Sequence, residues 1–297
     1  MLIKRRKTFY FISGALSVGA VVCIIAFGLN FGIDFTGGSV LSLQFVNQAP
    51  TAEQANEALR DLDLGQIDLQ KSGSGGLILK TKTLDEPTHQ QVSSRLAGLG
   101  EVVAGSESFN SIGPMIGKEL QGKTKVVAVL SLLVILVYIA LAFRKISRPV
   151  KSYVYGITSI IALCHDVLIP LGVMAVLGHY FGAEITIPII TAFLTVFGYS
   201  INDSVVVFDR VRENLIKTKT TDFGQVIDQS IIQTMARSLN TTLTTLLSLF
   251  AILFLGGETL RYFALCLIIG ITLGAYSSIF LATPLAFSYN KFRKGKR

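Results

Sequence analysis

The sequence has few cysteines, and their positions exclude several kinds of site. Its three cysteines, Cys23, Cys164 and Cys266, each lie within an apolar run, and none lies in the polar segment at 29–122. Disulfide frameworks and cysteine metal sites need clustered, regularly spaced cysteines, so we predict neither and expect buried structural thiols. The chain also has no Walker A sequence, no dinucleotide-binding fingerprint and no nucleophile elbow. We therefore expect no cofactor, no metal and no enzymatic activity.

Charged residues are also scarce, at 15% of the 297 residues, whereas 51% are hydrophobic and the mean hydropathy is +0.57. This composition is typical of an integral membrane protein. Six apolar segments can each cross a hydrocarbon core of ~30 Å as a helix, and they lie at about 8–28, 124–143, 153–178, 185–208, 239–257 and 262–287. The first resembles a secretory signal, but it exceeds the ~7–15 residues of a signal core, so we predict an uncleaved span.

Lysine and arginine residues predict the orientation of these spans. They gather in the N-terminal segment, in the loops after the second and fourth spans, and in the C-terminal tail. The short loops at 179–184 and 258–261 contain only one lysine or arginine between them, Arg261. By the positive-inside rule, both termini and the two basic loops are predicted to be cytoplasmic. The net charge of +8 is thereby explained without a nucleic-acid partner.

Residues 29–122 are predicted to form an extracytoplasmic α+β domain between the first span (1–28) and a five-helix bundle (123–297). We expect strands at 39–45, 66–70, 77–82 and 101–109 and helices at 51–61 and 85–99. Thr51 and Gln54 suit a capping box at the first of these helices. The order βαββαβ predicts a small ferredoxin-like domain. It holds no carboxylate–histidine cluster, and His89 is expected to be an exposed helix residue.

Asp203 lies in an apolar run at 185–208 that otherwise reads as a membrane span. An ionised carboxylate in hydrocarbon costs at least ~2.5–3.5 kcal/mol, so such a residue normally has a partner, a water-filled path or a function. The apolar run continues only about 8 Å beyond it, at 1.5 Å per residue. Asp203 is therefore either a shielded functional carboxylate or a residue that reaches the cytoplasmic headgroups.

His165 and Asp166 form a second polar position, about 18 Å into the third span. Two readings are open: a hydrogen-bonded pair that locks helices together, or a station on a proton path. Arg237, at the start of the fifth span, either extends to the headgroups or pairs with Asp203. In the second case protonation of Asp203 would release Arg237, which gives a switch driven by one proton.

Two weaker patterns concern the surroundings of these residues. Residues 222–236 read as an amphipathic helix at the cytoplasmic interface, within a cytoplasmic segment at about 210–237, and Asp222 and Gln225 fit a capping box. Gly270 and Gly274 have the GxxxG spacing of closely packed membrane helices.

Four segments together carry a family resemblance: FGIDFTGG at 31–38, SIGPMIGKEL at 111–120, His165–Asp166, and GYSINDSVVVFDRVREN at 198–214. The chain resembles the SecD/SecF family of protein-export membrane proteins, its SecF members in particular, within the resistance-nodulation-division superfamily. The resemblance implies an auxiliary subunit in the bacterial inner membrane that pairs with SecD and associates with the SecYEG channel. It also implies that the proton motive force, rather than ATP, helps to complete the export of unfolded polypeptides. The candidate proton-coupling residues are then Asp203, Arg237, His165, Asp166 and Asn202.

Two other functions fit the same residues. The chain could be half of a proton-coupled exporter of a lipid or small molecule. It could also be a non-transporting scaffold of a membrane complex, in which the buried charges only hold helices together.

Overall fold

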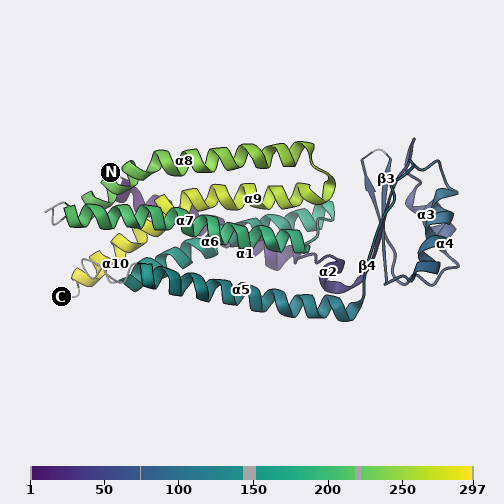
Figure 1. Cartoon of the computed structure of the whole chain (residues 1–297), viewed down its shortest axis with the longest axis horizontal. Helices are drawn as coiled ribbons and strands as arrows, with labels where there is room; N and C mark the ends of the chain where they lie inside the picture. The colour runs from purple at the N-terminus through teal and green to yellow at the C-terminus, as the bar shows by residue number, and fades with distance from the viewer. Residues whose placement is uncertain (1, 74, 143–151, 218–221, 296–297) are drawn as a thin grey trace. The chain divides into compact units, whose positions relative to one another are not determined.

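The computed structural model describes residues 2–73, 75–142, 152–217 and 222–295, so the basic loop predicted after the second span lies outside the described residues. The chain forms two compact units, Met1–Asn30 with Val126–Arg297, and Phe31–Lys125. The first unit is a bundle of long helices, and the second is a small sheet covered by helices (Figure 1).

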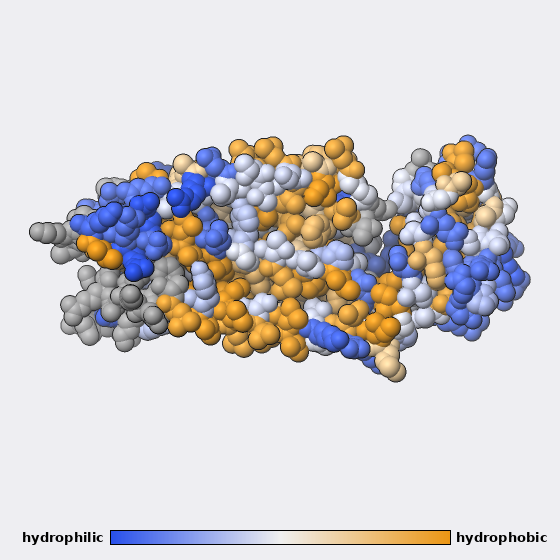
Figure 2. All heavy atoms as spheres, viewed as in Figure 1, coloured by the Kyte–Doolittle hydropathy of each residue, from blue (hydrophilic) through white to orange (hydrophobic). Residues whose placement is uncertain are grey.

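The helical unit contains the predicted spans. Among the described residues, six helices are long and apolar enough to cross a membrane. The elements of this unit are η1 (Leu2–Arg5), α1 (Arg6–Phe27), α6 (Ser152–Phe181), α7 (Ile187–Lys217), α8 (Phe223–Leu255), α9 (Glu258–Ser277), η2 (Ser278–Ala282) and α10 (Thr283–Gly295), together with the part of α5 (Pro114–Ala142) from Val126 onward. Helix α9 packs against α6, α7 and α8, and α1 packs on α6. Figure 2 shows hydrophobic residues along the middle of the bundle and hydrophilic ones near its termini.

Helix α8 corrects two predicted boundaries. The amphipathic segment at 222–236 and the fifth span are one continuous helix, Phe223–Leu255. Neither glycine nor proline interrupts the sequence between them, and Ala236 and Arg237 are good helix formers, so the helix continues. Its first half buries Phe223 and Ile231. The main-chain N–H of Ile3 also donates to Asp228, 3.0 Å away, and thereby ties the N-terminus to this helix.

Small residues allow the helices of the bundle to approach closely, as the GxxxG spacing predicted. A Cβ atom added at Gly270 would lie 2.4 Å from Val196 of α7, and one at Gly274 would lie 3.2 Å from Ser200. A Cβ at Gly172 of α6 would lie 2.6 Å from the Cα of Ala20 on α1. The backbones of α7 and α9 therefore come close at the level where the polar residues of α7 lie.

Replacing Gly270 with alanine should destabilise the bundle by about 1–3 kcal/mol, because the methyl group forces the buried Val196 to move. Unfolding of the purified chain in mixed micelles measures the change. Gly19→Ala is the matched control, since no atom of the described part of the chain lies within 4 Å of a Cβ at Gly19. Equal stability of the two variants would contradict the close packing of α7 and α9.

The second unit has the predicted βαββαβ order. Its elements are α2 (Ile33–Thr36), β1 (Gly38–Gln44), α3 (Ala52–Leu59), β2 (Asp68–Ser72), β3 (Gly76–Thr81), α4 (Glu86–Ala97) and β4 (Ser108–Ile112). The strands lie in the order β2-β3-β1-β4, and every neighbouring pair is antiparallel, as in a ferredoxin-like sheet. Thr51 and Gln54 form the predicted capping box. Asp85 caps α4, and hydrogen bonds from Thr88 lower the pKa of its carboxyl group.

Two predictions in this unit were wrong in detail. The last strand begins at Ser108 rather than at residue 101, because Gly105 turns the chain at a φ of 74°. His89 is not exposed: its side chain is 13% exposed, its ring stacks on Phe109 with centroids 3.8 Å apart, and Nε2 lies 2.8 Å from Glu107. Helical periodicity alone could not reveal that β4 lies under this face of α4.

The glycine pair in FGIDFTGG has a local structural reason. Gly37 ends α2 with a φ of 76°, and Gly38 opens β1 with a φ of 134°. A Cβ atom at Gly37 would lie 2.7 Å from the Cα of Pro114, and one at Gly38 would lie 2.8 Å from the carbonyl oxygen of Thr81. Both the backbone conformation and the available space therefore require glycine here.

Candidate functional site

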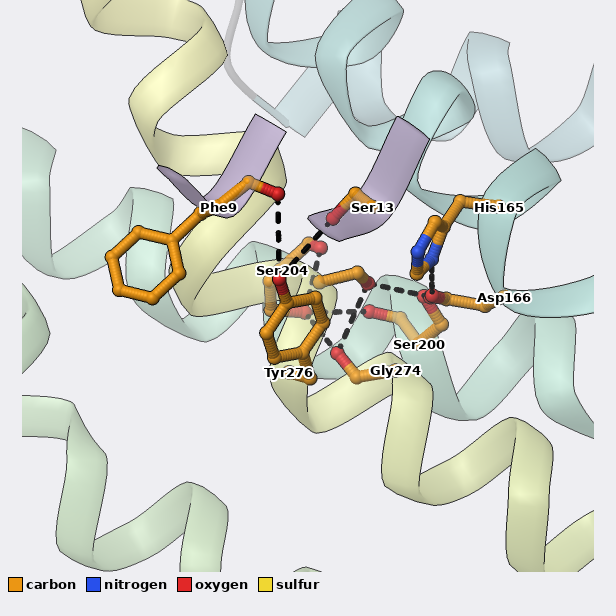
Figure 3. A network of polar contacts seen from close by, with 10 residues as sticks. Phe9, Ser13, His165, Asp166, Ser200, Ser204, Gly274 and Tyr276 are labelled. Carbon is orange, nitrogen blue, oxygen red and sulfur yellow. Dashed lines mark hydrogen bonds and ion pairs between the residues drawn. The ribbon is translucent and has the colours of Figure 1, made fainter. Parts of the chain in front are cut away.

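Asp166 joins three helices through a buried network (Figure 3). It is fully buried, and its Oδ1 lies 2.9 Å from Nδ1 of His165. Its Oδ2 accepts hydrogen bonds from Ser200 of α7 and Ser277 of α9, each at 2.6 Å. Hydroxyl–carboxylate distances of this length are typical of an ionised acceptor. The predicted helix lock is therefore present at Asp166.

His165 connects the network to α1. Its ring is 5% exposed and stacks on Tyr276, with the ring centroids 6.2 Å apart. The Tyr276 hydroxyl in turn lies 3.3 Å from the hydroxyl of Ser13 and 3.5 Å from the main-chain oxygen of Phe9. Among the described residues, Nε2 of His165 has no hydrogen-bond partner. In this buried ring, Nδ1 is therefore hydrogen-bonded, and Nε2 has no partner among the described residues.

Prolines disturb two helices beside this network. Pro170 lies within α6 and has no N–H to donate to the carbonyl group of Asp166, four residues earlier. Pro284 likewise cannot donate to Phe280, and the residues before it form the π-helical turn η2. The hydroxyl of Thr283 bonds the Ser278 carbonyl oxygen at 2.6 Å within this turn. Ser277 ends α9 and Ser278 begins this turn, so both serines lie where the winding of the helix changes.

We call Ser200, Ser204, Ser277 and Ser278 the serine cluster. The hydroxyls of Ser204 and Ser278 are 3.0 Å apart, and that of Ser278 bonds the Gly274 carbonyl oxygen at 2.9 Å. The Ser277 hydroxyl lies 3.3 Å from the same oxygen. We did not predict these serines, because single serines in apolar helices form no pattern of their own. The i,i+4 spacing of Ser200 and Ser204, next to Asp203, was the available signal.

Asp203 lies near the middle of α7, and its side chain is shielded. The residue is 7% exposed, and its Oδ1 accepts a hydrogen bond from Ser238 of α8. Its Oδ2 has no hydrogen-bond partner in the described part of the chain. The helix continues for fourteen residues beyond it, to Lys217. The bundle thus buries this carboxyl group but, among the described residues, gives a hydrogen-bond partner to only one of its oxygens.

Arg237 does not pair with Asp203 in this structure, so the predicted direct contact is not formed. Arg237 is exposed, and the next residue, Ser238, is the one that contacts Asp203. Successive helix residues point about 100° apart, which explains why only one of the two faces α7. Arg237 lines a surface hollow of about 200 Å³ together with Val205, Val206, Asp209, Arg210, Glu213 and Thr234.

Asn202, the remaining candidate, points away from this interior. It is exposed and shares one face of α7 with Thr191, Thr195 and Gly198, which are also exposed. Thr191 and Thr195 donate to the carbonyl oxygens four residues earlier, at 3.0 and 2.8 Å. Thr241 and Thr244 of α8, which are exposed, and the partly buried Thr245 do the same. These hydroxyls bond within their own helices, one of the two possibilities that their sequence allows.

The cysteines correct one further expectation. Cys266 is buried, but Cys23 is only partly buried and Cys164 is exposed on α6. Within the described residues, no group of three or more histidine, cysteine, aspartate or glutamate side chains is placed to hold a metal ion. The arrangement can therefore bind and release protons, through a buried carboxylate and a buried imidazole, or it can hold helices together.

Comparison with known proteins decides the family. The model of the C-terminal part of the protein-export membrane proteins SecD/SecF matches residues 91–292, and the model of the SecD/SecF GG motif matches residues 24–49. The chain belongs to the SecD/SecF family. The GG motif contains Gly37 and Gly38, whose backbone requirement is described above. The resemblance drawn from four short segments is thus confirmed.

Relatives match over nearly the whole chain. Protein translocase subunit SecF of Thermobaculum terrenum is 37% identical, over 97% of this chain and 93% of the relative. Protein translocase subunit SecF of Haemophilus influenzae is 36% identical, over 96% of this chain and 84% of the relative. Family membership and the six apolar helices make this a multi-pass bacterial membrane protein.

A longer relative contains this chain as one part. SecDF of Thermus thermophilus is 34% identical over 95% of this chain, which corresponds to 37% of that protein. A crystal structure of SecDF from this organism, described as a translocon-associated membrane protein, superposes with a TM-score of 0.83 and 32% identity. The match covers 97% of this chain and 38% of that one. In that relative, more than half of the protein therefore lies outside the region that this chain matches.

Proposed function

We propose that this chain is an auxiliary subunit of the Sec export machinery that couples proton entry at Asp203 to a conformational cycle. The observation that carries the proposal is the state of the Asp203 carboxyl group: buried in the middle of α7, with one oxygen bonded to Ser238 and the other open. A residue of this kind in a membrane span marks a proton or ion path. The proposed role involves no covalent chemistry. Export driven by a proton gradient should stop when Asp203 is replaced by asparagine.

The proposed setting is the bacterial inner membrane, with both termini in the cytoplasm, as the positive-inside rule predicts. The Phe31–Lys125 unit then lies on the opposite side of the membrane. The proposed partners are a SecD-type protein, the SecYEG channel and unfolded exported polypeptides. Support comes from the Thermus thermophilus relative, which is named SecDF and described as translocon-associated.

Energies make the proton scheme feasible. One elementary charge that crosses 100 mV releases ~2.3 kcal/mol. A pH difference adds about 1.4 kcal/mol per unit, since that energy corresponds to a tenfold concentration ratio. Moving a two-state equilibrium from 1:99 to 99:1 needs ~5.5 kcal/mol. One proton therefore biases the cycle without driving a complete swing, and the remainder must come from further protons or from the polypeptide.

Ser238 and Arg237 give Asp203 two alternative partners on one helix. In the present state the carboxyl group contacts the Ser238 hydroxyl, while Arg237 faces the hollow beside Val205 and Val206. Rotation of α8 about its axis would exchange the hydroxyl for the guanidinium group, because adjacent residues differ by about 100°. Ionisation of Asp203 strengthens its attraction to the guanidinium group and protonation weakens it, whereas the Ser238 hydroxyl can donate to either form of the carboxyl group. An Asp203–Arg237 distance that exceeds a water-bridged contact in every state of export would remove this exchange.

The exposed polar face of α7, formed by Thr191, Thr195, Gly198 and Asn202, is the proposed SecD-docking face. Membrane helices associate through small and polar residues rather than through large apolar ones. A SecD-type half is the occupant that fits, because the relative matched over only 37% of its length is a SecDF protein in one chain.

Gly198→Leu should reduce co-purification with the SecD-type partner at least tenfold, because among the described residues no atom lies within 4 Å of a Cβ at Gly198 and a bulky side chain would hold the partner helix away. Co-purification from membranes with a tagged partner measures the loss. Val129→Leu on the exposed surface of α5 is the control and should leave association unchanged. Full association of the Gly198 variant would exclude this face as the docking surface.

Among the described residues, Asp166 is the one buried charge at which the structure favours a helix-stabilising role, as in the non-transporting scaffold. All the carboxylate contacts of Asp166 are made within the bundle, and they connect α6, α7 and α9. We therefore assign Asp166 a structural role as well, whereas Asp203, with its open oxygen, is the proposed coupling residue.

A further inference from the structure

His165 and Asp203 each leave one proton-binding atom open in the same buried region. Nε2 of His165 and Oδ2 of Asp203 have no hydrogen-bond partner among the described residues. The other polar atom of each side chain is engaged, Nδ1 of His165 with Asp166 and Oδ1 of Asp203 with Ser238. A proton that enters this interior therefore has two distinct places to bind.

Asp166 determines the net charge of the His165–Asp166 pair. Its Oδ2 accepts from two serine hydroxyls and its Oδ1 faces Nδ1 of His165, so an ionised Asp166 satisfies every contact. An ionised carboxylate accepts only, which makes Nδ1 the donor and leaves Nε2 as the atom that takes a further proton. With neutral His165 the pair carries a charge of −1, and a proton on Nε2 makes it neutral overall.

The serine cluster brings this pair close to Asp203. Ser200 bonds Asp166 and lies three residues before Asp203 on α7, while Ser204 follows Asp203 directly and bonds Ser278. The Ser278 hydroxyl also bonds the carbonyl oxygen of Gly274. Because residues three apart lie on the same side of a helix, the Ser200 bond places the Asp166 carboxylate next to the turn of α7 that carries Asp203. At a given distance, two buried carboxylates interact more strongly than they would in water.

We infer that Asp203 and the His165–Asp166 pair form one coupled protonation unit, connected by the serine cluster, in which a proton at either position weakens binding at the other. Coupled groups lose protons in steps that belong to the set rather than to one residue. The unit holds one proton more readily than two, so each proton taken up at Asp203 changes the charge felt at His165. This inference rests on the proposed function in so far as Asp203 is the proton-accepting carboxylate of export.

The surroundings supply few competing charges. Around His165, the contacts place Asp166 on α6, Tyr276 on α9 and Ser13 on α1. On the other helices, α8 contributes Ser238 beside Asp203, with Arg237 exposed, and Cys164 is exposed on α6. Asp203 is therefore the negative group outside the pair whose removal should alter His165 most.

Histidine NMR of the full chain in lipid nanodiscs tests the inference, because the chain has only three histidines. Asp203→Asn removes a negative charge, so the imidazolium form of His165 becomes less favourable. The pH midpoint of His165 should fall by about one unit relative to the unsubstituted chain, the size that defines strong coupling. His89, in the other unit, and the exposed His179 are internal controls and should not move.

An unchanged His165 midpoint would overturn the coupling, and so would an equal shift of all three histidines, which would mark a global change. Asp203→Ser removes the same charge and serves as a second variant if the asparagine variant does not fold. Export activity is measured separately on the same variants. Lost export with an unmoved His165 midpoint would leave the proposed function standing and remove only the coupling. A shifted His165 midpoint with normal export would support the coupling and remove the proposed function of Asp203 in export.

Discussion

Replacing Asp203 with asparagine is expected to abolish the stimulation of protein export by a proton gradient while leaving the fold and the association with a SecD-type partner intact. Asparagine keeps the size of the side chain and can still accept a hydrogen bond from Ser238, but it cannot take up or release a proton. The buried position of Asp203 means that no water-exposed carboxylate can replace it. Export of a preprotein into inner-membrane vesicles, with and without a proton gradient, measures the loss.

Asp209→Asn is the matched control for this experiment. Asp209 lies on the same helix, six residues later, but it is exposed and forms only a weak ion pair with Arg212, at 3.7 Å. Exposed pairs of this kind contribute about 0–1 kcal/mol, so gradient-driven export should be normal. Gradient-stimulated export at the unsubstituted level in Asp203→Asn vesicles would show that the proton role is wrong and would return Asp203 to a structural one.

Replacing Asp166 with leucine should destabilise the bundle by about 3–5 kcal/mol, the usual cost of removing one partner from a buried charged network. The change leaves the hydroxyls of Ser200 and Ser277 and the Nδ1 atom of His165 without their acceptor. It also places a larger side chain beside Gly274, where a Cβ atom would lie only 3.7 Å from Asp166. Unfolding in mixed micelles and the yield of folded chain in membranes measure the effect.

Thr244→Val on α8 is the control for Asp166→Leu. It also exchanges a polar side chain for an apolar one, but Thr244 is exposed and its hydroxyl bonds only carbonyl oxygens of its own helix. We expect a change within about 0.5 kcal/mol. If Asp166→Leu were as mild as this control, Asp166 would not be the junction of α6, α7 and α9.

These two experiments separate the functions that remained open from the sequence. A scaffold in which all buried charges serve only assembly predicts that Asp203 and Asp166 variants fail together, at the level of stability. The structure instead gives the two carboxylates different environments, one with all contacts satisfied and one with an open oxygen. A folded, partner-bound Asp203 variant without proton-driven export would exclude the scaffold.

Local patterns predicted the elements of this protein well. Apolar runs of about 20 residues must be helices in a membrane, since lipid cannot satisfy exposed backbone groups, and six such helices are present. The period-2 and helical patterns of the polar segment predicted βαββαβ, and the Thr51–Gln54 capping box follows from residue identity and spacing alone. Some predicted boundaries of helices and strands differ from the structure. The junction within α8 contains no helix breaker, so the pattern changes there while the helix continues.

The partners of the buried polar residues were not predictable in this way. Asp203 and Arg237 are opposite charges on neighbouring helices, and their pairing was the natural prediction, yet α8 presents Ser238 instead. His165 and Asp166 are adjacent in sequence, but Ser200 lies 34 residues away and Ser277 lies 111 residues away. A one-residue rotation of a helix, about 100°, changes which side chain meets its neighbour, and no local pattern encodes that angle.

The sequence by itself determined the membrane-spanning class, the number of long helices, the βαββαβ unit and the family, because hydropathy, spacing and short motifs are local properties. Only the tertiary structure decided that Asp166 is a junction of three helices, that Asp203 contacts Ser238 through one oxygen, and that Ser200 and Ser277 both bond Asp166. Those contacts depend on how closely α7 and α9 approach at Gly270 and Gly274, and on the π-helical turn at Ser278–Ala282. Packing between distant segments sets the geometry of the site, and therefore only the folded chain reveals it.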